Sequence, residues 1–323
     1  MMLRLRTVVR LALFAMPLLA GHAFAQDYPN RPIRLFVPFT PGGGIDTSAR
    51  IIGKKFSENM GQPVIVENRP GGNTLIATEA LVRSAPDGYT LIMQTNNLSS
   101  NPALYGNKLG YDTFKDLAPI SLVAGAPHVL VVHPSIAARN LAEFIALAKA
   151  RPGTISFASA GSGTVNHLAG EMLKKLAGID MLHVPYKGSG SVMPDLLANH
   201  VNTLFASIPN VTQHLRSGAL RAIAVTSAKR FRALPDVPTI AELGYPGYDI
   251  ATWRGLFAPA GTPPAVINRL HAEVLKALKD PAVQEQLADS FVVGGTPEEL
   301  GAFLRADVER IGAIIRFSGA KVD

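Results

Sequence analysis

Residues 33–46 read Ile33-Arg34-Leu35-Phe36-Val37-Pro38-Phe39-Thr40-Pro41-Gly42-Gly43-Gly44-Ile45-Asp46, and this stretch decides the fold class. A short apolar run leads directly into a glycine-rich turn. Apolar residues then recur at helical spacing, at Ile45, Ile52 and Phe56. A strand that passes through a tight turn into a helix is the repeating unit of an α/β fold.

The glycines of this turn also indicate a binding site. They carry no side chain, so backbone N–H groups can approach a ligand closely. The N-terminus of a helix attracts anions, and the turn therefore predicts an anion site. The alternative is a plain flexible connector. In both cases we expect Asp46 to be the N-cap of the helix, and we expect Gly43 to need a positive φ.

The rest of the chain repeats the alternation of strands and helices. Short apolar runs typical of strands are Val64–Val66, Thr90–Met93, Val129–Val132, Ile155–Ala158 and Leu220–Val225. Helical spacing joins three sets of apolar residues: Leu141, Phe144, Ile145 and Ala148; Leu168, Met172 and Leu176; Ile267, Leu270, Val274 and Leu278. Residues 263–315 are predicted to be mostly helical, with breaks near Pro281 and Gly294-Gly295. The pattern predicts parallel sheets covered by helices on both faces.

A second turn of the same kind is Ser159-Ala160-Gly161-Ser162-Gly163-Thr164-Val165-Asn166-His167. Its hydroxyls and backbone N–H groups suit a carboxylate. A nucleophile elbow would need glycine two residues to either side of Ser162, where Ala160 and Thr164 stand. A dinucleotide fingerprint would need glycine at Asn166, and the phosphate-loop lysine is missing. His167 is interpreted as a capping or solvent-facing residue rather than a catalytic base.

A third strand and turn, His183-Val184-Pro185-Tyr186-Lys187-Gly188-Ser189, follows the same plan. Lys187 either neutralises ligand charge or is an ordinary exposed lysine, and both alternatives stay open.

The N-terminus is typical of a secretory signal peptide. Arg4, Arg6 and Arg10 precede an apolar run, and Ala23-Phe24-Ala25 offers a cleavage site before Gln26. The run is about half the roughly 20 residues that a spanning helix needs. We therefore expect residues 1–25 to be removed, which leaves a periplasmic protein with a net charge near 7 − 3 = +4. The chain has no cysteine, so neither a disulfide nor a lipid anchor on cysteine is expected.

Composition argues against several classes of function. Lysine and arginine are scattered, with residues 230–232 as the densest patch, so no nucleic-acid interface is predicted. The eight histidines show no metal-ligand spacing. We predict no metal site, no cofactor, no catalytic residues and no enzymatic activity.

Seven motifs, taken together, carry a resemblance to a known family. They are residues 27–33 (DYPNRPI), 37–44 (VPFTPGGG), 67–71 (ENRPG), 85–90 (APDGYT), 184–188 (VPYKG), 234–239 (LPDVPT) and 257–263 (FAPAGTP). In this order they resemble the tripartite tricarboxylate transporter receptors, the Bug-type extracytoplasmic solute-binding receptors. The resemblance covers the chain from about residue 27 to its end and is specific because so many motifs agree.

The resemblance implies a two-domain periplasmic binding-protein fold, type II-like, with the ligand cleft between the domains. Domain 1 would hold residues 26–125 and 251–323, and domain 2 residues 126–250. The implied function is capture of a small carboxylate-bearing ligand, such as a di- or tricarboxylate or an aromatic acid, by a monomer. The implied partners are the membrane permease subunits of a tripartite transporter. A sensor of the same fold that feeds a signalling kinase is the alternative.

The candidate ligand-binding residues come from both loops and from the expected pocket wall: Phe39, Thr40, Gly42, Gly43, Gly44, Asp46, Asn96, Ser159, Ala160, Ser162, Gly163, Thr164, Asn166, His167, Ala206 and Trp253. Many relatives carry aspartate where this chain has Ala206, which disfavours a ligand with an ammonium group. For Trp253, the only tryptophan, a place in the hinge-side core is the alternative.

Overall fold

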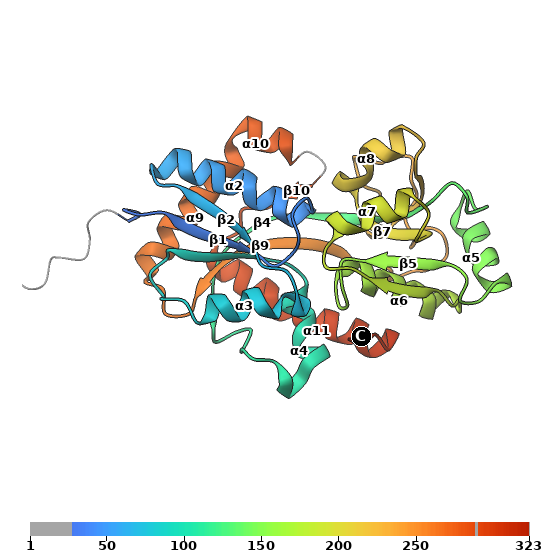
Figure 1. Cartoon of the computed structure of the whole chain (residues 1–323), viewed down its shortest axis with the longest axis horizontal. Helices are drawn as coiled ribbons and strands as arrows, with labels where there is room; N and C mark the ends of the chain where they lie inside the picture. The colour runs from blue at the N-terminus through green and yellow to red at the C-terminus, as the bar shows by residue number, and fades with distance from the viewer. Residues whose placement is uncertain (1–27, 288–289, 323) are drawn as a thin grey trace, which may run out of the picture.

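The computed structural model describes residues 28–287 and 290–322. The predicted signal peptide, residues 1–25, lies outside this range. Figure 1 shows two α/β halves side by side, joined by strands that run between them. All ten strands form one curved sheet, with the main order β2-β1-β3-β9-β4-β7-β5-β6.

The first half contains five neighbouring strands, β2-β1-β3-β9-β4, and the short strand β10 beside β4, with helices on both faces of the sheet. Its strands and helices are β1 (Ile33–Val37), α2 (Gly44–Met60), β2 (Val64–Asn68), α3 (Leu75–Val82), β3 (Thr90–Gln94), α4 (Asn97–Tyr105), part of β4 (Leu117–Val132), β9 (Ala251–Pro259), α9 (Pro264–Lys279), α10 (Pro281–Gln286) and β10 (Phe291–Val292). Short 3₁₀ turns occupy Gly72–Thr74 and Gly106–Lys108. One face of the sheet packs against α2, α9 and α10, and the other against α3, α4 and α11 (Pro297–Ser318). The core therefore lies in two layers, one on each side of the sheet.

The second half has the same layered plan. Its strands and helices are α5 (Leu141–Ala150), β5 (Ser156–Ser159), α6 (Val165–Ala177), β6 (Leu182–Pro185), α7 (Ser189–Leu197), β7 (Thr203–Ser207), α8 (Ile208–Arg216) and β8 (Arg221–Val225). Alternate residues of its strands point into two separate clusters: Leu130 and Phe205 pack on the side of α5 and α6, Val129 and Leu204 on the side of α7 and α8. This alternation follows from the two-residue period of a strand.

The two halves are joined by β4 and β9, which run antiparallel. Their pairing extends from Leu117 opposite Pro259 to Pro127 opposite Ala251, and β4 then continues with residues 128–132 paired to β7 and β8. The expectation of purely parallel sheets is thus wrong at the centre of the molecule. Because the chain crosses on β4 and returns on β9 beside it, these two strands must run in opposite directions.

Most of the predicted elements are confirmed. Strands β1, β2, β3, β5 and β8 and helices α5, α6 and α9 lie where periodicity places them. Strand β4 is much longer than the predicted 129–132, because prolines and glycine interrupt its apolar pattern before that point. The breaks in the C-terminal helical segment are also confirmed, near Pro281 and before Pro297.

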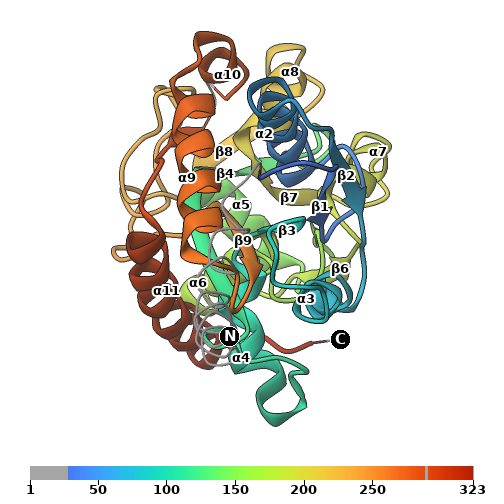
Figure 2. The ribbon, with the colours of Figure 1, turned by 90° about the vertical axis from the view of Figure 1, so that its left-hand side faces the viewer.

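The last helix, α11, contacts both halves: it lies beside α4 of the first half and α6 of the second (Figure 2). Thr296 and Glu299 form a capping box at its start. Leu300 and Leu304 pack in the first half, whereas Ile311 and Ile315 belong to the core of the second. The division into domains 26–125 plus 251–323 and 126–250 stays a prediction, and α11 reaches beyond it.

Candidate functional site

A cavity lies between the two halves, and the centre of a water molecule can occupy about 70 Å³ of it. The loops over it are in contact, since the Thr40 N–H lies 3.5 Å from the Lys187 carbonyl oxygen. The chain is therefore closed over the cavity. Its wall comes from both halves: Phe39, Gly44, Ile45, Thr95, Asn96, Asn97, His128, Ala160, Thr164, Val165, Asn166, Met193, Leu204, Ala206, Ser207, Asn210, Thr252 and Arg254.

Four helices begin at this cavity. Strands β1, β3, β5 and β7 each lead into a helix, α2, α4, α6 and α8, and residues at the start of all four line the wall. Within the described chain, none of the four N-cap residues, Gly43, Asn96, Thr164 and Ser207, caps its helix with a side-chain hydrogen bond. The N–H groups of four first turns therefore present positive partial charge to one small space.

The first loop is built by glycine and braced by Asp46. Gly42 has a φ of 87°, which favours glycine, whereas Gly43 is extended with a φ of −80°. The expected positive φ at Gly43 is wrong, and so is the expectation that Asp46 is the N-cap, because Gly43 holds that position. Asp46 Oδ2 accepts from the Gly42 N–H at 3.0 Å.

Asp46 is a buried carboxylate whose negative charge is balanced by Arg50 and by hydrogen-bond donors. Its carboxylate also accepts from Arg50 Nε and from Asn68 Nδ2, at 3.0 and 2.8 Å. Burial raises the pKa of this carboxyl, but the bonds from Arg50, Gly42 and Asn68 outweigh it and hold the pKa below its ordinary value. Asp46 thus fixes the loop from behind and does not line the cavity.

The second loop uses much of its own hydrogen-bonding capacity internally. The Gly161 N–H donates to Ser159 Oγ at 3.1 Å, and the Gly163 N–H to His167 Nδ1 at 3.0 Å. The Thr164 hydroxyl donates to the Gly161 carbonyl at 2.6 Å. His167 is further held by stacking on His183, with ring centroids 4.0 Å apart. These contacts brace the loop, and Val165 and Asn166 at the start of α6 line the cavity.

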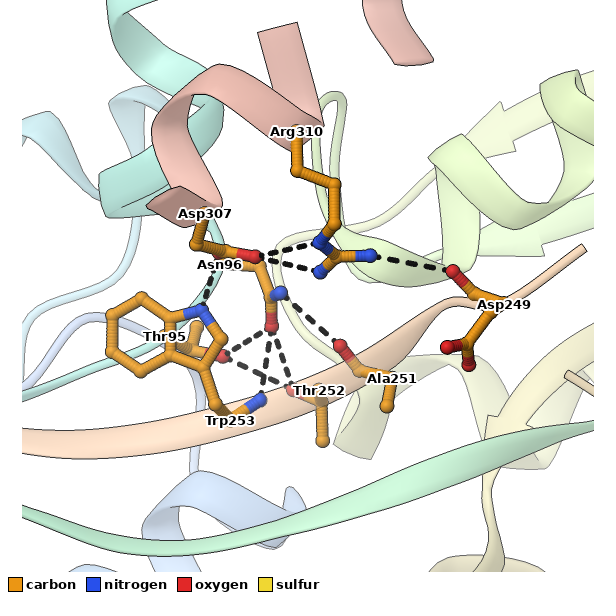
Figure 3. A network of polar contacts seen from close by, with 8 residues as sticks. All are labelled: Thr95, Asn96, Asp249, Ala251, Thr252, Trp253, Asp307 and Arg310. Carbon is orange, nitrogen blue, oxygen red and sulfur yellow. Dashed lines mark hydrogen bonds and ion pairs between the residues drawn. The ribbon is translucent and has the colours of Figure 1, made fainter. Parts of the chain in front are cut away.

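Asn96 connects the cavity to the crossing strand (Figure 3). Its Nδ2 donates to the Ala251 carbonyl, and its Oδ1 accepts from the Trp253 N–H at 3.1 Å and from the Thr252 hydroxyl at 3.2 Å. Trp253 itself points away from the cavity, because its Nε1 donates to Asp307 of α11 at 2.7 Å. The interpretation of Trp253 as hinge-side core is the one that agrees with this geometry.

Arg254 is the residue that the sequence reasoning missed. Only 3% of it is exposed, and its Nη1 donates to the hydroxyls of Ser48 at 3.1 Å and Ser290 at 3.4 Å. Among residues 28–287 and 290–322 no carboxylate pairs with it. Burial lowers the pKa of Arg254 to about 10, so the side chain is still cationic at pH 7. A charged residue in the apolar stretch 251–259 is a local signal for it, but this signal does not tell which face of the strand the side chain is on.

His128 lies beside this cation. Burial, and then the charge of Arg254, lower the pKa of His128 to about 3, so the imidazole is neutral. Its Nδ1 is buried and has no hydrogen-bond partner within the described structure. No described residue of the cavity wall is acidic. The wall thus carries one cation, neutral polar groups and apolar side chains.

Of the predicted ligand-binding residues, seven line the cavity: Phe39, Gly44, Asn96, Ala160, Thr164, Asn166 and Ala206. The others lie outside its wall: Thr40, Gly42, Gly43, Asp46, Ser159, Ser162, Gly163, His167 and Trp253. Lys187 is exposed at the rim, where it lines a separate depression.

The family model of the "Tripartite tricarboxylate transporter family receptor" matches residues 48–319. The chain belongs to this family. It is a family of solute-binding receptors, not of enzymes, and the resemblance found in the motifs is confirmed.

Solved structures agree with this assignment. The periplasmic binding protein BugD superimposes with a TM-score of 0.87 at 35% identity, over 92% of this chain and 100% of the other. The R. palustris protein Rpa4515, solved with adipate, has a TM-score of 0.88 at 32% identity, over 92% and 100%. MatC from Rhodopseudomonas palustris, with bound malate, has a TM-score of 0.85 at 31% identity, over 89% and 99%. The predicted periplasmic binding-protein fold is confirmed.

The described residues contain neither a membrane-spanning helix nor a candidate metal site. In the described residues, no helix is long and apolar enough to span a membrane. The same residues contain no group of three or more histidine, aspartate or glutamate side chains placed to hold a metal ion.

Proposed function

We propose that this receptor captures a small organic carboxylate in the periplasm and delivers it to the permease subunits of a tripartite transporter. The observation that carries the proposal is the charge of the cavity. Four helix N-termini and one buried guanidinium face it, and its described wall holds no acidic side chain. Such a site favours an anion because helix N-termini and a cation attract negative charge.

The backbone supplies the direct contacts in this proposal. The first-turn N–H groups at Gly44 and Ile45 in one half, and at Val165 and Asn166 in the other, would hold the ligand. Because they belong to opposite halves, a ligand that binds both groups favours the closed arrangement. Two relatives hold the dicarboxylates adipate and malate, which is the same chemical class.

Export and partnership rest on separate support. The basic, apolar and Ala23-Phe24-Ala25 segments are typical of a cleaved signal peptide, which would release the receptor into the periplasm. The family description names a transporter receptor, and a permease is therefore the partner that we infer. We propose that the receptor acts as a monomer.

Calorimetry on the purified receptor tests the binding step. A panel of mono-, di- and tricarboxylates, aromatic acids and amino acids is titrated, and each acid that binds is compared with its amide. We expect at least one acid to bind, and its fully amidated form to bind at least about tenfold more weakly, because charge-assisted bonds are lost. Equal binding of acid and amide would refute the anion site.

Uptake in cells tests delivery. The radiolabelled form of the best acid should enter cells that carry the receptor and its permease, and uptake should fall to background when the receptor gene is deleted. Unchanged uptake in the deletion strain would refute the transport role while leaving the binding result intact.

A further inference from the structure

We propose that Arg254 is a specificity-determining residue that makes the receptor select dicarboxylates over monocarboxylates. One carboxylate would bind the Arg254 guanidinium, and the second would bind the helix N-termini on the opposite face of the sheet. This inference rests on the proposed function and adds the number of charges that the ligand carries.

The guanidinium of Arg254 lies against the start of α2. A Cβ added to Gly44 would lie 2.7 Å from Arg254 Nη2, so the cation touches the first residue of α2. The same Cβ would lie 3.6 Å from Asn210 Oδ1 of α8. Arg254 therefore meets the start of α2, and Asn210 of α8 lies close to the same residue, Gly44. Helices α2 and α8 lie on the same side of the sheet (Figure 1). This is the charged end of the cavity.

The guanidinium has no charged partner among the described residues. Its described partners are two serine hydroxyls, which are neutral. Buried charges in proteins are normally paired with an opposite charge. A planar guanidinium matches a carboxylate by two parallel hydrogen bonds. A carboxylate from the ligand is the partner that completes this end.

The other end of the cavity is formed by the starts of two different helices. Helices α4 and α6 begin there, at Asn97 and Val165, and they pack on the opposite face of the sheet from α2 and α8. Asn97 is 1% exposed and lines the cavity. The first-turn N–H groups of α4 and α6 would hold a second carboxylate, and the described wall residues of these two helices carry no charge.

The wall between these ends excludes other ligands. Phe39, Met193 and Leu204 contribute apolar surface that suits a short methylene chain. A ligand ammonium would meet Arg254 and the N–H donors without an acidic partner among the described wall residues. A monocarboxylate would leave one of the two anion-binding ends unfilled. A short dicarboxylate satisfies both.

The test compares matched ligands in calorimetry: succinate, glutarate and adipate, each beside its monoamide. We expect the best dicarboxylate to bind about 10–100-fold more tightly than its monoamide, since one charge-assisted interaction is lost. Arg254→Gln should weaken that dicarboxylate by a similar factor and change the monoamide much less, so that the preference disappears. Arg254→Lys should retain part of the preference.

The matched control is Arg83→Gln, since Arg83 is a surface residue at the end of α3 whose side chain is 69% exposed. It should bind like the wild type. The inference is refuted if wild type binds the monoamide as tightly as the dicarboxylate, a result that does not depend on any variant folding. It is also refuted if folded Arg254→Gln keeps the full preference. In either case tight binding of monocarboxylates would leave the proposed function standing, whereas binding of amides but of no acid would remove both.

Discussion

Replacing Arg254 with methionine should stabilise the ligand-free receptor while it weakens ligand binding. Burial lowers the pKa of Arg254 from 12.5 to about 10. At 1.36 kcal/mol per unit, keeping the buried side chain charged costs about 3 kcal/mol. Methionine is unbranched and flexible and, although shorter than arginine, fills most of the same apolar space without a charge, so this cost disappears.

The gain is partly offset. The hydroxyls of Ser48 and Ser290, each 1% exposed, lose a hydrogen bond to the guanidinium. The bond from the charged group to Ser48 contributes about 1.5 kcal/mol, and the longer bond to Ser290, at 3.4 Å, contributes about 0.5 kcal/mol. The expected net increase in the free energy of unfolding is about 1–2 kcal/mol. Because the folded pKa is lowered, the cost is fully present below about pH 10 and is relieved only as the pH rises further. A measurement at pH 7 therefore captures all of it.

Urea unfolding, followed by the fluorescence of the single, buried Trp253, measures both effects. Ligand at a hundred times its Kd should add about 2.7 kcal/mol to the wild type and much less to Arg254→Met. The variant should therefore be the more stable protein without ligand and the less stable one with it. Arg83→Met is the control and should lie within about 0.5 kcal/mol of wild type. A ligand-free Arg254→Met that is destabilised by more than about 1 kcal/mol would show that the cation is needed for folding, and the reasoning would be wrong.

Three further predictions concern the loops. Gly44→Ala should weaken binding at least about tenfold in calorimetry, because the new Cβ would lie only 2.7 Å from Arg254 Nη2 and would push the guanidinium aside. The control Gly301→Ala should bind normally, because its Cβ would make only an ordinary contact. Thr164→Ala should weaken binding about 2–10-fold by loosening the loop that its hydroxyl braces, and Thr164→Ser should restore it; equal affinities for all three would contradict that role. Asp46→Asn should lose about 1.5–3 kcal/mol in urea unfolding at pH 7. The pKa of Asp46 is lowered in the folded protein, so its stabilisation is fully present above the unfolded value near 4 and is lost as the pH falls through the folded pKa. The difference in stability between the two proteins should therefore shrink below about pH 4, and a constant difference would argue against the ion pair.

The sequence predicted the strand–turn–helix units well because their signals are local. The two loops that it selected do begin helices at the cavity, and Gly44, Thr164 and Asn166 lie on the wall. Loop hydroxyls and N–H groups were harder to assign, since Ser159 and Thr164 could bond either to a ligand or to their own loop. The structure shows the bonds within the loop.

Arg254 and His128 could not be found in the same way. Arg254 lies on β9 and His128 on β4, and the pairing of these two strands joins residues more than a hundred positions apart. Neighbouring residues of a strand point to opposite faces, so a shift of one residue decides whether Trp253 or Arg254 faces the cavity. Nothing local in the sequence fixes that choice. The contact of Trp253 with Asp307, on the last helix, does.

Helix α11 holds the two halves together on one side of the molecule. It is attached to the cores of both halves and packs along the crossing strand β4, so that side of the molecule stays shut. The two loops over the cavity meet through their backbones: the Thr40 N–H lies 3.5 Å from the Lys187 carbonyl oxygen, and Gly190 lies against the Pro41 carbonyl. Separation of these two loops would open the cavity. We therefore expect a solute to enter and leave between residues 39–42 and 186–190.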